Sequence, residues 1–403
     1  MRPNSCHRLA AAVAILTGLL GAPGTATATI APAYTVTDLG NFFATGVNDS
    51  SWVSGYDTRA LVWQPGLGTQ QILGPLDCTS GCTTRANAIN NAGEVAGYVW
   101  YTNFSSLRAI RWSASGGVVD MGDLPGGGNY SRGYAINAQG WVAGQASGQY
   151  SSHPNFGNQS FQHATLFKSP TDIFELQDLP PGTQNSNGRG INDAGAVVGE
   201  RNTSTGWRAV YWAPDGKALD LDAEWGGGGA PSFASDINNH GQVAMQLPLA
   251  TGGATAAIWQ AGVGFTVIDL LPGTNTAIAN AINDEGVTVG TAGTAFSRGF
   301  VWSLADGLAD LNDLLDPVSG DGWSILQATG ISESGLIVGR GFSDTLGYRA
   351  VLLSPASEPV PVPEPATVLL LMVGLAGLAL GARRRQGQRQ REPRQTQRQR
   401  LKL

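Results

Sequence analysis

The 403-residue sequence contains few of the residues that usually carry out chemistry. It has three cysteines and four histidines, and only 13% of its residues are charged. Cys6 lies in an N-terminal segment that we expect to be removed, which leaves Cys78 and Cys82. Two cysteines are too few for a zinc site, and no histidine lies near them in sequence. Their spacing instead suits a small loop disulfide in an oxidising compartment, with free thiols as the alternative.

Histidine, serine and acidic residues also form no catalytic or metal-binding pattern. His153, His163 and His240 are far apart in the sequence. The segment from Gly330 to Gly335 contains serines but lacks the Gly-x-Ser-x-Gly spacing of a nucleophile elbow. The acidic stretch from Asp310 to Asp321 lacks the residue order of a calcium loop, so we interpret it as a solvated loop. We therefore predict no catalytic residue, no cofactor and no metal ligand.

Basic residues are scarce in the central part of the chain. Between Thr29 and Pro363 there are 28 acidic and 13 basic residues, which give this part a net charge of −15. Binding to a phosphate backbone needs clustered lysine and arginine, so this balance argues against a nucleic-acid partner. It suits an extracellular surface.

Helical periodicity is missing from the same region, whereas glycine is abundant. No stretch of it sustains a helical period, and 56 of the 403 residues are glycine. Valine, threonine and tryptophan are frequent, which favours short strands joined by tight turns. The composition therefore predicts an all-β chain.

The N-terminal segment 1–28 has the three parts of a secretory signal peptide. Arg2 and Arg8 come before an apolar run from Leu9 to Leu20, and Ala26-Thr27-Ala28 follows as a cleavage site. The apolar run is short for a membrane span. We expect the mature chain to begin near Thr29, with a retained N-terminal anchor as the alternative.

A nine-residue pattern occurs seven times without gaps. It begins with Val or Ile, has Asn second in six copies and ends in Gly in six copies. The Asn or Ser positions lie 42, 47, 55, 46, 45 and 49 residues apart, which indicates one supersecondary unit per copy. Ser51, Met245 and Ser332 depart from the pattern and put the local turn geometry in question. The copies are Val47–Gly55, Ile89–Gly97, Ile136–Gly144, Ile191–Gly199, Ile237–Met245, Ile282–Gly290 and Ile331–Gly339.

Each unit is interpreted as four short strands. The Asn and a second Gly, at the fifth position of every copy except the first, predict a tight turn between the first two strands, because both residues tolerate unusual backbone angles. The third strand carries a small residue and, three positions later, a large one, such as Ala209 and Trp212, which we expect to pack between neighbouring sheets. The fourth strand is expected to end at Ile72-Leu73, Asp120-Met121, Asp178-Leu179, Asp220-Leu221, Asp269-Leu270 and Asp310-Leu311.

An arginine recurs immediately before the small residue of the third strand. It is expected either to form a ring of positive charge on one surface or to pair with the recurrent Asp between neighbouring units, and pairing is the simpler interpretation. The residues are Arg59, Arg108, Arg208, Arg298 and Arg349.

The seventh unit has no fourth strand of its own, because Ser354-Pro355 leads into a Pro-rich segment. Tyr34 to Gly40, near the mature N-terminus, is an orphan copy of that strand. If it pairs with Arg349 to Leu353, the units close into a ring, as radial β architectures do to avoid exposed edges. Residues 34–354 thus predict a seven-bladed β-propeller of four-stranded blades closed by the N-terminal strand. An irregular β-solenoid or a pair of β-sandwiches is the alternative.

With Ala-x-x-Ile-Asn-x-x-Gly, then His/Arg-Ala-x-x-Trp, then Asp-Leu, the units resemble the HAF repeats of secreted bacterial proteins. The resemblance covers about Tyr34 to Ser354. It implies an extracellular β domain and no particular reaction.

The C-terminal part resembles a PEP-CTERM sorting signal. A Pro-rich linker over 355–366 contains Val362-Pro363-Glu364-Pro365, an apolar run over 367–382 predicts a transmembrane helix, and Arg383-Arg384-Arg385 opens a basic tail over 383–403. By the positive-inside rule the tail stays cytoplasmic and the acidic body lies outside. The resemblance implies that an exosortase-type enzyme recognises Val362 to Pro365 and releases or transfers the body.

These observations predict an exported, surface-associated protein whose propeller is a non-enzymatic binding module or a component of an exopolysaccharide matrix. The alternative is a propeller glycosidase or polysaccharide lyase with its site at the central channel. An enzyme should gather convergent carboxylates or a histidine at one mouth of the channel, whereas a binding module should present aromatic and arginine rims.

Overall fold

The computed structural model describes residues 34–72, 81–101, 106–149, 160–177, 179, 183, 185–226, 230–293 and 297–356. The predicted signal peptide 1–28, transmembrane helix 367–382 and tail 383–403 lie outside these residues, as does most of the linker 355–366. Within the described ranges, no helix combines the length and the hydrophobicity that a membrane crossing requires.

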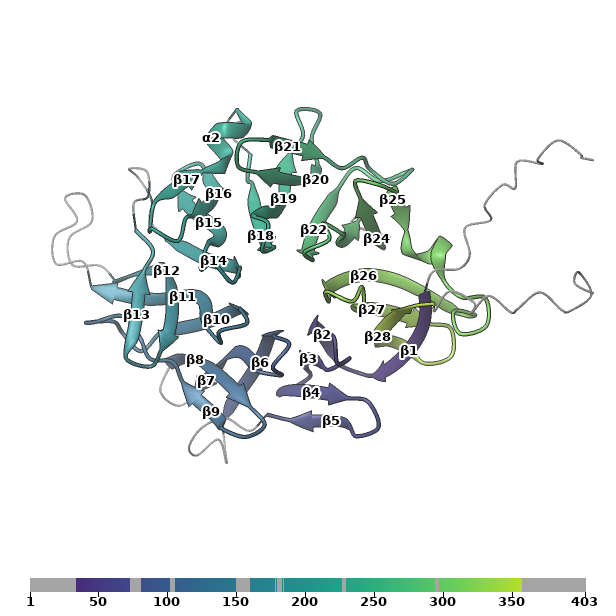
Figure 1. Ribbon diagram of the computed structural model, residues 1–403, viewed down its shortest axis with the longest axis horizontal. Coiled ribbons are helices and arrows are strands. Elements are labelled where there is room, and N and C mark those ends of the chain that lie inside the picture. The colour runs from purple at the N-terminus through teal and green to yellow at the C-terminus, as the bar shows by residue number, and fades with distance from the viewer. Residues whose placement is uncertain are drawn as a thin grey trace, which may run out of the picture. The chain divides into compact units, whose positions relative to one another are not determined.

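Seven four-stranded antiparallel sheets are arranged around an axis, with the first strand of each repeat nearest the centre (Figure 1). The predicted all-β, seven-bladed propeller is therefore confirmed. Blades 1 to 3 contain β2 (Phe43–Val47), β3 (Val53–Tyr56), β4 (Ala60–Gln64) and β5 (Gly68–Gln71); β6 (Cys82–Ile89), β7 (Val95–Tyr101), β8 (Ser106–Ser113) and β9 (Gly117–Asp120); and β10 (Ser131–Ile136), β11 (Val142–Gln149), β12 (Ser160–Ser169) and β13 (Asp172–Glu175). Blades 4 to 6 contain β14 (Ser186–Ile191), β15 (Val197–Thr203), β16 (Gly206–Trp212) and β17 (Ala218–Asp220); β18 (Phe233–Ile237), β19 (Gln242–Pro248), β20 (Ala254–Gln260) and β21 (Gly264–Val267); and β22 (Ala277–Ile282), β23 (Thr288–Ala292), β24 (Arg298–Ser303) and β25 (Gly307–Asp310).

Blade 7 is closed by the N-terminal strand, as the sequence predicts. Its strand order is β26 (Trp323–Ile331), β27 (Ile337–Ser343), β28 (Gly347–Pro355) and β1 (Tyr34–Gly40). β1 and β28 are antiparallel, with Val36 opposite Leu353. Arg349 Nη2 lies 2.9 Å from Asp38 Oδ2, which adds an ion pair across the seam. The edge of β28 is thereby covered by a strand that is more than 300 residues away in the sequence.

The turn between the first two strands of a blade is built on the recurrent Asn. In blade 1, Asn48 Oδ1 accepts hydrogen bonds from the backbone N–H of Ser50 and of Trp52, at 3.1 and 2.9 Å. Ser51 adopts a φ of 60°, the left-handed conformation that glycine provides in the other blades. The turn geometry is therefore kept at this departure from the pattern.

The Gly that ends the pattern is required by the close approach of two strands. A Cβ atom on Gly144 or Gly199 would overlap the carbonyl oxygen of Arg132 or Asn187 on the first strand of the same blade. Each first strand has a shift of register near this point, which is a β-bulge. Blade 5 keeps the bulge although Met245 replaces Gly, and the Met245 side chain is fully buried between blades 4 and 5.

The core lies between adjacent blades, where small and large side chains alternate. The small residue of the third strand has no exposed surface in six blades, where it is alanine, for example Ala109 and Ala209. Trp212 and Trp259 are at most 2% exposed. The backbone N–H of Ala109 also donates to Ser131 Oγ of the next blade at 3.0 Å. Packing and hydrogen bonding together join neighbouring blades, which supports the predicted role of the small–large pair.

The ends of two fourth strands differ from the prediction. β13 ends at Glu175 and β21 at Val267, so the aligned pairs are Glu175-Leu176 and Val267-Ile268. Leu176 and Ile268 donate backbone hydrogen bonds to the small residue of the third strand, as Met121 does in blade 2. Asp269-Leu270 was wrongly assigned, because this acidic–apolar pair follows the end of β21 by two residues. β13 likewise ends before Asp178-Leu179, of which Asp178 lies outside the described residues. Leu73, in the pair Ile72-Leu73 assigned to blade 1, lies outside the described residues.

Two short helices follow fourth strands that do end in Asp. Asp220 caps α2 (Leu221–Trp225) by accepting a hydrogen bond from Ala223 N. Asp310 caps the 3-10 helix η1 (Leu311–Leu314) through Asn312 N. In both places the Asp terminates the strand and begins a helical turn.

Candidate functional site

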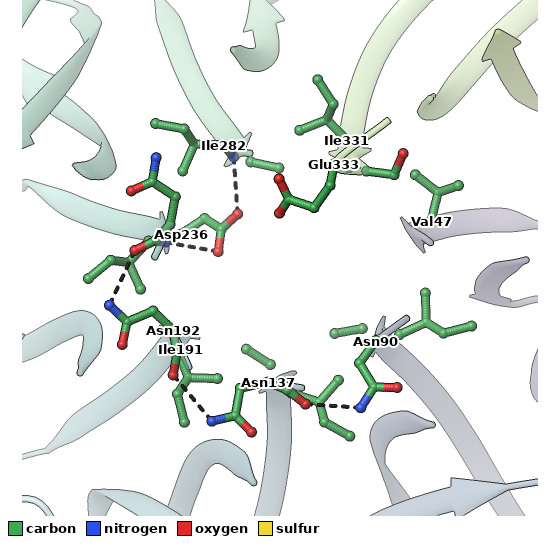
Figure 2. A pocket seen from close by; sticks show the side chains of 18 of the residues that line it. Val47, Asn90, Asn137, Ile191, Asn192, Asp236, Ile282, Ile331 and Glu333 are labelled. Atoms are coloured by element: carbon green, nitrogen blue, oxygen red, sulfur yellow. Dashed lines mark hydrogen bonds between the residues drawn. The ribbon is translucent and has the colours of Figure 1, made fainter. Parts of the chain in front are cut away.

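The central channel is lined by the first strands of the blades and encloses a cavity of about 370 Å³ (Figure 2). The residue three positions before the recurrent Asn lies at the β-bulge in every blade and lines this cavity. A bulge changes the direction of a side chain, so one residue from each blade faces the axis. The type of this residue is not fixed by the repeat pattern. The residues are Thr45, Asn87, Tyr134, Arg189, Ser235, Asn280 and Thr329.

Four of these channel residues connect neighbouring blades. Asn87 Nδ2 donates to the carbonyl oxygen of Gly133 in the next blade at 2.7 Å, and Asn280 Nδ2 donates to Ala328 at the same distance. Thr329 Oγ1 donates to Ala44 across the seam at 2.9 Å, and Thr45 makes the corresponding bond in blade 1. These side chains therefore have a structural role.

The other three channel residues, in blades 3 to 5, donate no hydrogen bond to the next blade within the described part of the chain. Arg189 instead pairs with Glu200, with Nη2 2.7 Å from Oε1, and its guanidinium group lies 4.4 Å from the centroid of the Tyr134 ring. Ser235 lines both the channel and an adjoining cavity of about 400 Å³. The channel is thus chemically asymmetric.

The recurrent Asn residues form a relay around one mouth of the channel. Each amide donates to the carbonyl oxygen of the equivalent residue in the next blade, for example Asn90 Nδ2 to Asn137 at 2.9 Å (Figure 2). The relay continues to Ser332, whose side chain has no amide to make the seventh link. Ser334 N instead donates to Asp49 Oδ1 at 2.7 Å. The bonds are Asn48 to Asn90, Asn90 to Asn137, Asn137 to Asn192, Asn192 to Asn238, Asn238 to Asn283 and Asn283 to Ser332.

In four blades, the residue after the recurrent Asn or Ser gives this mouth a negative charge. Asp49, Asp193, Asp284 and Glu333 occupy this position, and we call them the acidic mouth. Each accepts a backbone hydrogen bond from the preceding blade, such as Asp284 N to Glu333 Oε2 at 2.8 Å. Burial opposes ionisation of Asp49, but hydrogen bonds from Ser334 outweigh it and lower the pKa of this carboxyl. The acidic mouth therefore helps to hold the blades together.

Asp236 is the exception among the residues that line this end of the channel. It lies two positions before the recurrent Asn, where the other six blades have Gly or Ala. Its two oxygens accept hydrogen bonds from Ile237 N at 2.9 Å and Ile282 N at 3.1 Å. Burial nevertheless raises the pKa of Asp236 to about 7, and the charge of Glu333 adds to the effect.

Glu333 shares the site with Asp236. Both carboxylates point into the opening of the channel (Figure 2). Burial, followed by repulsion from Asp284, Asp49 and Asp193, raises the pKa of Glu333. Two acids with raised pKa values at one mouth could exchange protons with a bound molecule.

The opposite end of the hairpins carries stacked arginine and aromatic side chains. In blade 1, Phe43 pairs with Tyr56 at the end of β2–β3 that is farthest from the Asn48 turn. The guanidinium of Arg85 lies 4.2 Å from the Tyr56 ring centroid, and that of Arg132 lies 5.3 Å from the Tyr98 centroid. Such distances are those of cation–π contacts. We call the set Phe43, Tyr56, Arg85, Tyr98, Tyr130, Arg132, Arg340 and Tyr348 the arginine–aromatic rim.

The rim follows one structural rule across three blade boundaries. The residue after the pattern Gly in one blade stacks on the residue five positions before the Asn in the next, as Tyr56 stacks on Arg85. Tyr98 and Arg132 repeat the contact between blades 2 and 3. At the seam the same contact recurs with the arginine and the aromatic residue in exchanged positions. Here Arg340 follows the pattern Gly and lies 5.3 Å from the centroid of the Phe43 ring.

A groove of about 660 Å³ opens along the rim over blades 1 to 3. Tyr56, Tyr98 and Tyr130 line it together with Arg85 and Arg132. Trp100 also lines it, with 49% of its surface exposed. Asp57 is the one carboxylate among the described residues of the lining, and it accepts hydrogen bonds from its neighbours Thr58 and Arg59.

The rim was missed in the sequence because its residues do not recur in every blade. The positions of Tyr56 and Tyr98 hold Gln145, Glu200 and Gln246 in blades 3 to 5. An alignment of all repeats therefore shows no common residue type at this position. A comparison of neighbouring repeats at these two positions would have found it.

Four of the five recurrent arginines pair with Asp, although not between blades, and Arg59 forms no ion pair within the described residues. Arg108 Nε lies 3.0 Å from Asp120 Oδ2 on the adjacent strand of the same blade, and Arg298 pairs with Asp310 in the same way. The predicted inter-blade pairing is thus wrong. In both pairs the Arg lies on the third strand and the Asp on the fourth strand of the same blade, and these two strands are neighbours in one sheet.

The remaining candidate residues are scattered. His163 Nδ1 lies 3.3 Å from Glu175 Oε1, and His240 lies in a hairpin turn; His153 lies outside the described residues. Cys82 takes part in a disulfide, while Cys78 lies outside the described residues, so their pairing stays a prediction. Among the described ranges, no group of three His, Cys, Asp or Glu side chains is arranged to hold a metal ion.

Comparisons with known proteins identify the fold and one short motif. No curated protein sequence matches the chain. A puromycin-hydrolysing peptidase of Mycobacterium tuberculosis is 13% identical with a TM-score of 0.50, over 83% of this chain and 57% of that one. A prolyl endopeptidase structure is 10% identical with a TM-score of 0.50, over 81% and 51% of the two chains. Virginiamycin B lyase from Staphylococcus aureus is 10% identical with a TM-score of 0.46, over 80% and 99%.

At these identities the similarity shows the fold alone, and the chain spans little more than half the length of the two peptidases. The C-terminal match carries more information. Residues 361–385 match the PEP-CTERM protein-sorting motif. They include Val362 to Pro365 and the basic stop Arg383 to Arg385, which lie outside the described residues. The chain therefore carries a PEP-CTERM sorting signal and is an exported protein.

Proposed function

We propose that the protein is a non-enzymatic binding module of the cell surface that holds extracellular polysaccharide at its arginine–aromatic rim. The signal peptide over 1–28 starts export, and the helix over 367–382 with its basic tail anchors the chain in the membrane. An exosortase-type enzyme then processes it at Val362 to Pro365. The resemblance of the blades to HAF repeats supports an extracellular β domain.

The groove over blades 1 to 3 is the observation that carries this proposal. Sugar rings have an apolar C–H face and polar edges, so they bind where exposed aromatic rings lie beside hydrogen-bonding side chains. Trp100 is 49% exposed in the groove, and Tyr98 and Arg132 lie in the same lining. A groove, unlike a closed pocket, also admits a long polymer.

Replacing Trp100 tests the assignment of the binding surface. Trp100→Ala should abolish retention of the purified protein on a polysaccharide gel, because the exposed platform is lost. Phe174→Ala is the matched control, since Phe174 is 45% exposed on an outer strand and lies outside the groove. Equal retention of both variants and the unmodified protein would refute the groove as the binding site.

Mass spectrometry of exported material tests the proposed processing. The C-terminal peptide should end within or next to Val362 to Pro365. Material outside the membrane that still contains Leu403 would contradict cleavage at the motif.

A second function, an extracellular glycosidase or lyase, is favoured by Asp236 and Glu333. An acid with a pKa near 7 beside a second carboxylate is an arrangement used for general acid–base catalysis. If this function holds, the protein should shorten a polysaccharide, and Asp236→Asn and Glu333→Gln should each stop the reaction while leaving binding at the rim unchanged. Unchanged polymer length after prolonged incubation with the unmodified protein would exclude turnover of that polymer.

A further inference from the structure

Among the residues that the structure describes, three arginines of the rim have no acidic partner, which is unusual for the basic residues of this chain. Between residues 29 and 363 there are 13 basic residues, all of them described, and eight form ion pairs with Asp or Glu. The other five are Arg59, Arg85, Arg132, Lys168 and Arg340. Arg85, Arg132 and Arg340 belong to the rim, where aromatic rings take the place of carboxylates.

The same arginines retain their hydrogen-bonding capacity. Stacking uses one face of a guanidinium plane and leaves the N–H groups at its edges available. In the described part of the chain, Arg85 donates no side-chain hydrogen bond, and Arg132 donates one, from Nη1 to Tyr134 Oη at a long 3.4 Å. The Nε atom of Arg132 is buried and has no partner. Between residues 29 and 363 acidic residues are about twice as numerous as basic ones, so most basic side chains could have found an acidic partner within the protein. The rim arginines have none among the described residues, and they are therefore available to pair with an acidic ligand.

Deepening the proposed function on which it rests, we propose that the groove binds a polysaccharide with carboxylate groups, a polymer of uronic acids. Arg85 and Arg132 bind sugar carboxylates through two parallel N–H···O bonds each, the geometry that a guanidinium group offers and an ammonium group does not. Trp100, which is 49% exposed, contacts the ring faces between the charged groups. Arg340 extends the positive edge across the seam.

A nucleic acid is the weaker candidate for the same groove. Binding to a phosphate backbone relies on many lysines and arginines, whereas the rim has three arginines and no lysine. Asp57 lies in the lining, and the body as a whole is acidic. Few charges, each with a planar hydrogen-bonding edge, fit a carboxylate better than a densely charged phosphate chain.

The test compares a charged and an uncharged form of one polymer, with a nucleic acid as a third ligand. Polygalacturonate, its fully methyl-esterified form and single-stranded DNA are titrated against the purified protein at one salt concentration. Polygalacturonate should bind at least about tenfold more tightly than the methyl ester, because esterification removes the carboxylate charge. The double variant Arg85→Gln/Arg132→Gln should lose this difference, whereas Lys168→Gln should retain it. Lys168 is a matched control, a cation 4.2 Å from the centroid of the Trp141 ring and outside the groove.

Each outcome decides a defined claim. Equal binding of both polymers would overturn the acidic ligand and leave polysaccharide binding intact, whereas binding of neither would remove the proposed function as well. Tighter binding of DNA, lost in the double variant, would assign the rim to nucleic acid. If the double variant fails to fold, the two polymers compared on the unmodified protein still decide, and Arg85→Lys/Arg132→Lys should weaken polygalacturonate binding while keeping the positive charge.

Discussion

At the scale of single residues, Asp236 places an ionisable group where six other blades have Gly or Ala. Its pKa in the folded protein is about 7, above the value of about 3.9 for an unperturbed Asp. Between these values the folded chain holds a proton that the unfolded chain has released. The free energy of unfolding therefore falls as the pH rises from about 4 to about 7.

Asp236→Ala removes this group and restores a residue that the channel accepts in Ala88 and Ala281. The variant should show a flatter dependence of Tm on pH between 4 and 7 and a higher Tm than the unmodified protein at pH 8. Thermal unfolding across this range measures both effects. Asp306→Ala, which removes an exposed carboxylate in a turn, is the control. An unchanged pH slope in Asp236→Ala would mean that Asp236 is not the titrating group.

Ser51 is the second residue at which a blade departs from the others. It adopts a φ of 60°, a left-handed conformation that costs a non-glycine residue about 1 to 2 kcal/mol. Ser51→Gly should raise the free energy of unfolding by about 1 kcal/mol, after allowing for the greater flexibility of glycine in the unfolded chain. Denaturant titration measures the gain. Ser50→Gly, a change in the same turn without positive φ, should not stabilise, and an equal gain there would contradict the explanation.

At the scale of the blade, the pattern Gly decides whether the first two strands can meet. Gly144→Ala would force a Cβ atom against the carbonyl oxygen of Arg132 and should lower the free energy of unfolding by about 3 kcal/mol. Gly148→Ala is a control within the same strand, because its Cβ would lie 3.6 Å from Leu124 Cδ1, an ordinary contact. Denaturant titration of both variants is the measurement. Similar losses in the two variants would show that strand glycine as such, and not the close approach, matters.

The sequence predicted elements well where their residues are buried in every blade. The Asn turns, the pattern Gly and the small–large pair of the third strand all recur because they pack against a neighbouring blade. The fourth strand lies at the outer edge, where Phe174 is 45% exposed, so little packing constrains its sequence. The Asp-Leu pairs at Asp178 and Asp269 were therefore taken for the ends of β13 and β21, which end two or three residues earlier. The rim escaped prediction for the opposite reason: Arg85 and Arg132 serve a surface that only part of the ring presents.

At the scale of the whole molecule, one strand closes the ring. Leu39 is 5% exposed, and Val36 packs against the core between blades 6 and 7. A chain that begins at Asn41 should lose at least about 3 kcal/mol of unfolding free energy relative to one that begins at Tyr34, because it loses this burial and the β1–β28 hydrogen bonds. It should also associate through the exposed edge of β28. Thermal unfolding and size-exclusion chromatography measure the two effects, and equal stability and size of the two chains would contradict closure by β1.

The closed ring presents two chemically different ends, an acidic mouth that holds the blades together and an arginine–aromatic rim that we assign to the ligand. Hydrogen exchange of backbone amides with and without saturating polygalacturonate oligomers tests this assignment most directly. Exchange should slow in the strand ends and loops that carry Tyr56, Arg85, Trp100 and Arg132, with no change around Asp236 and Glu333. Protection confined to Asp236 and Glu333 would place the ligand at the acidic mouth and contradict the account.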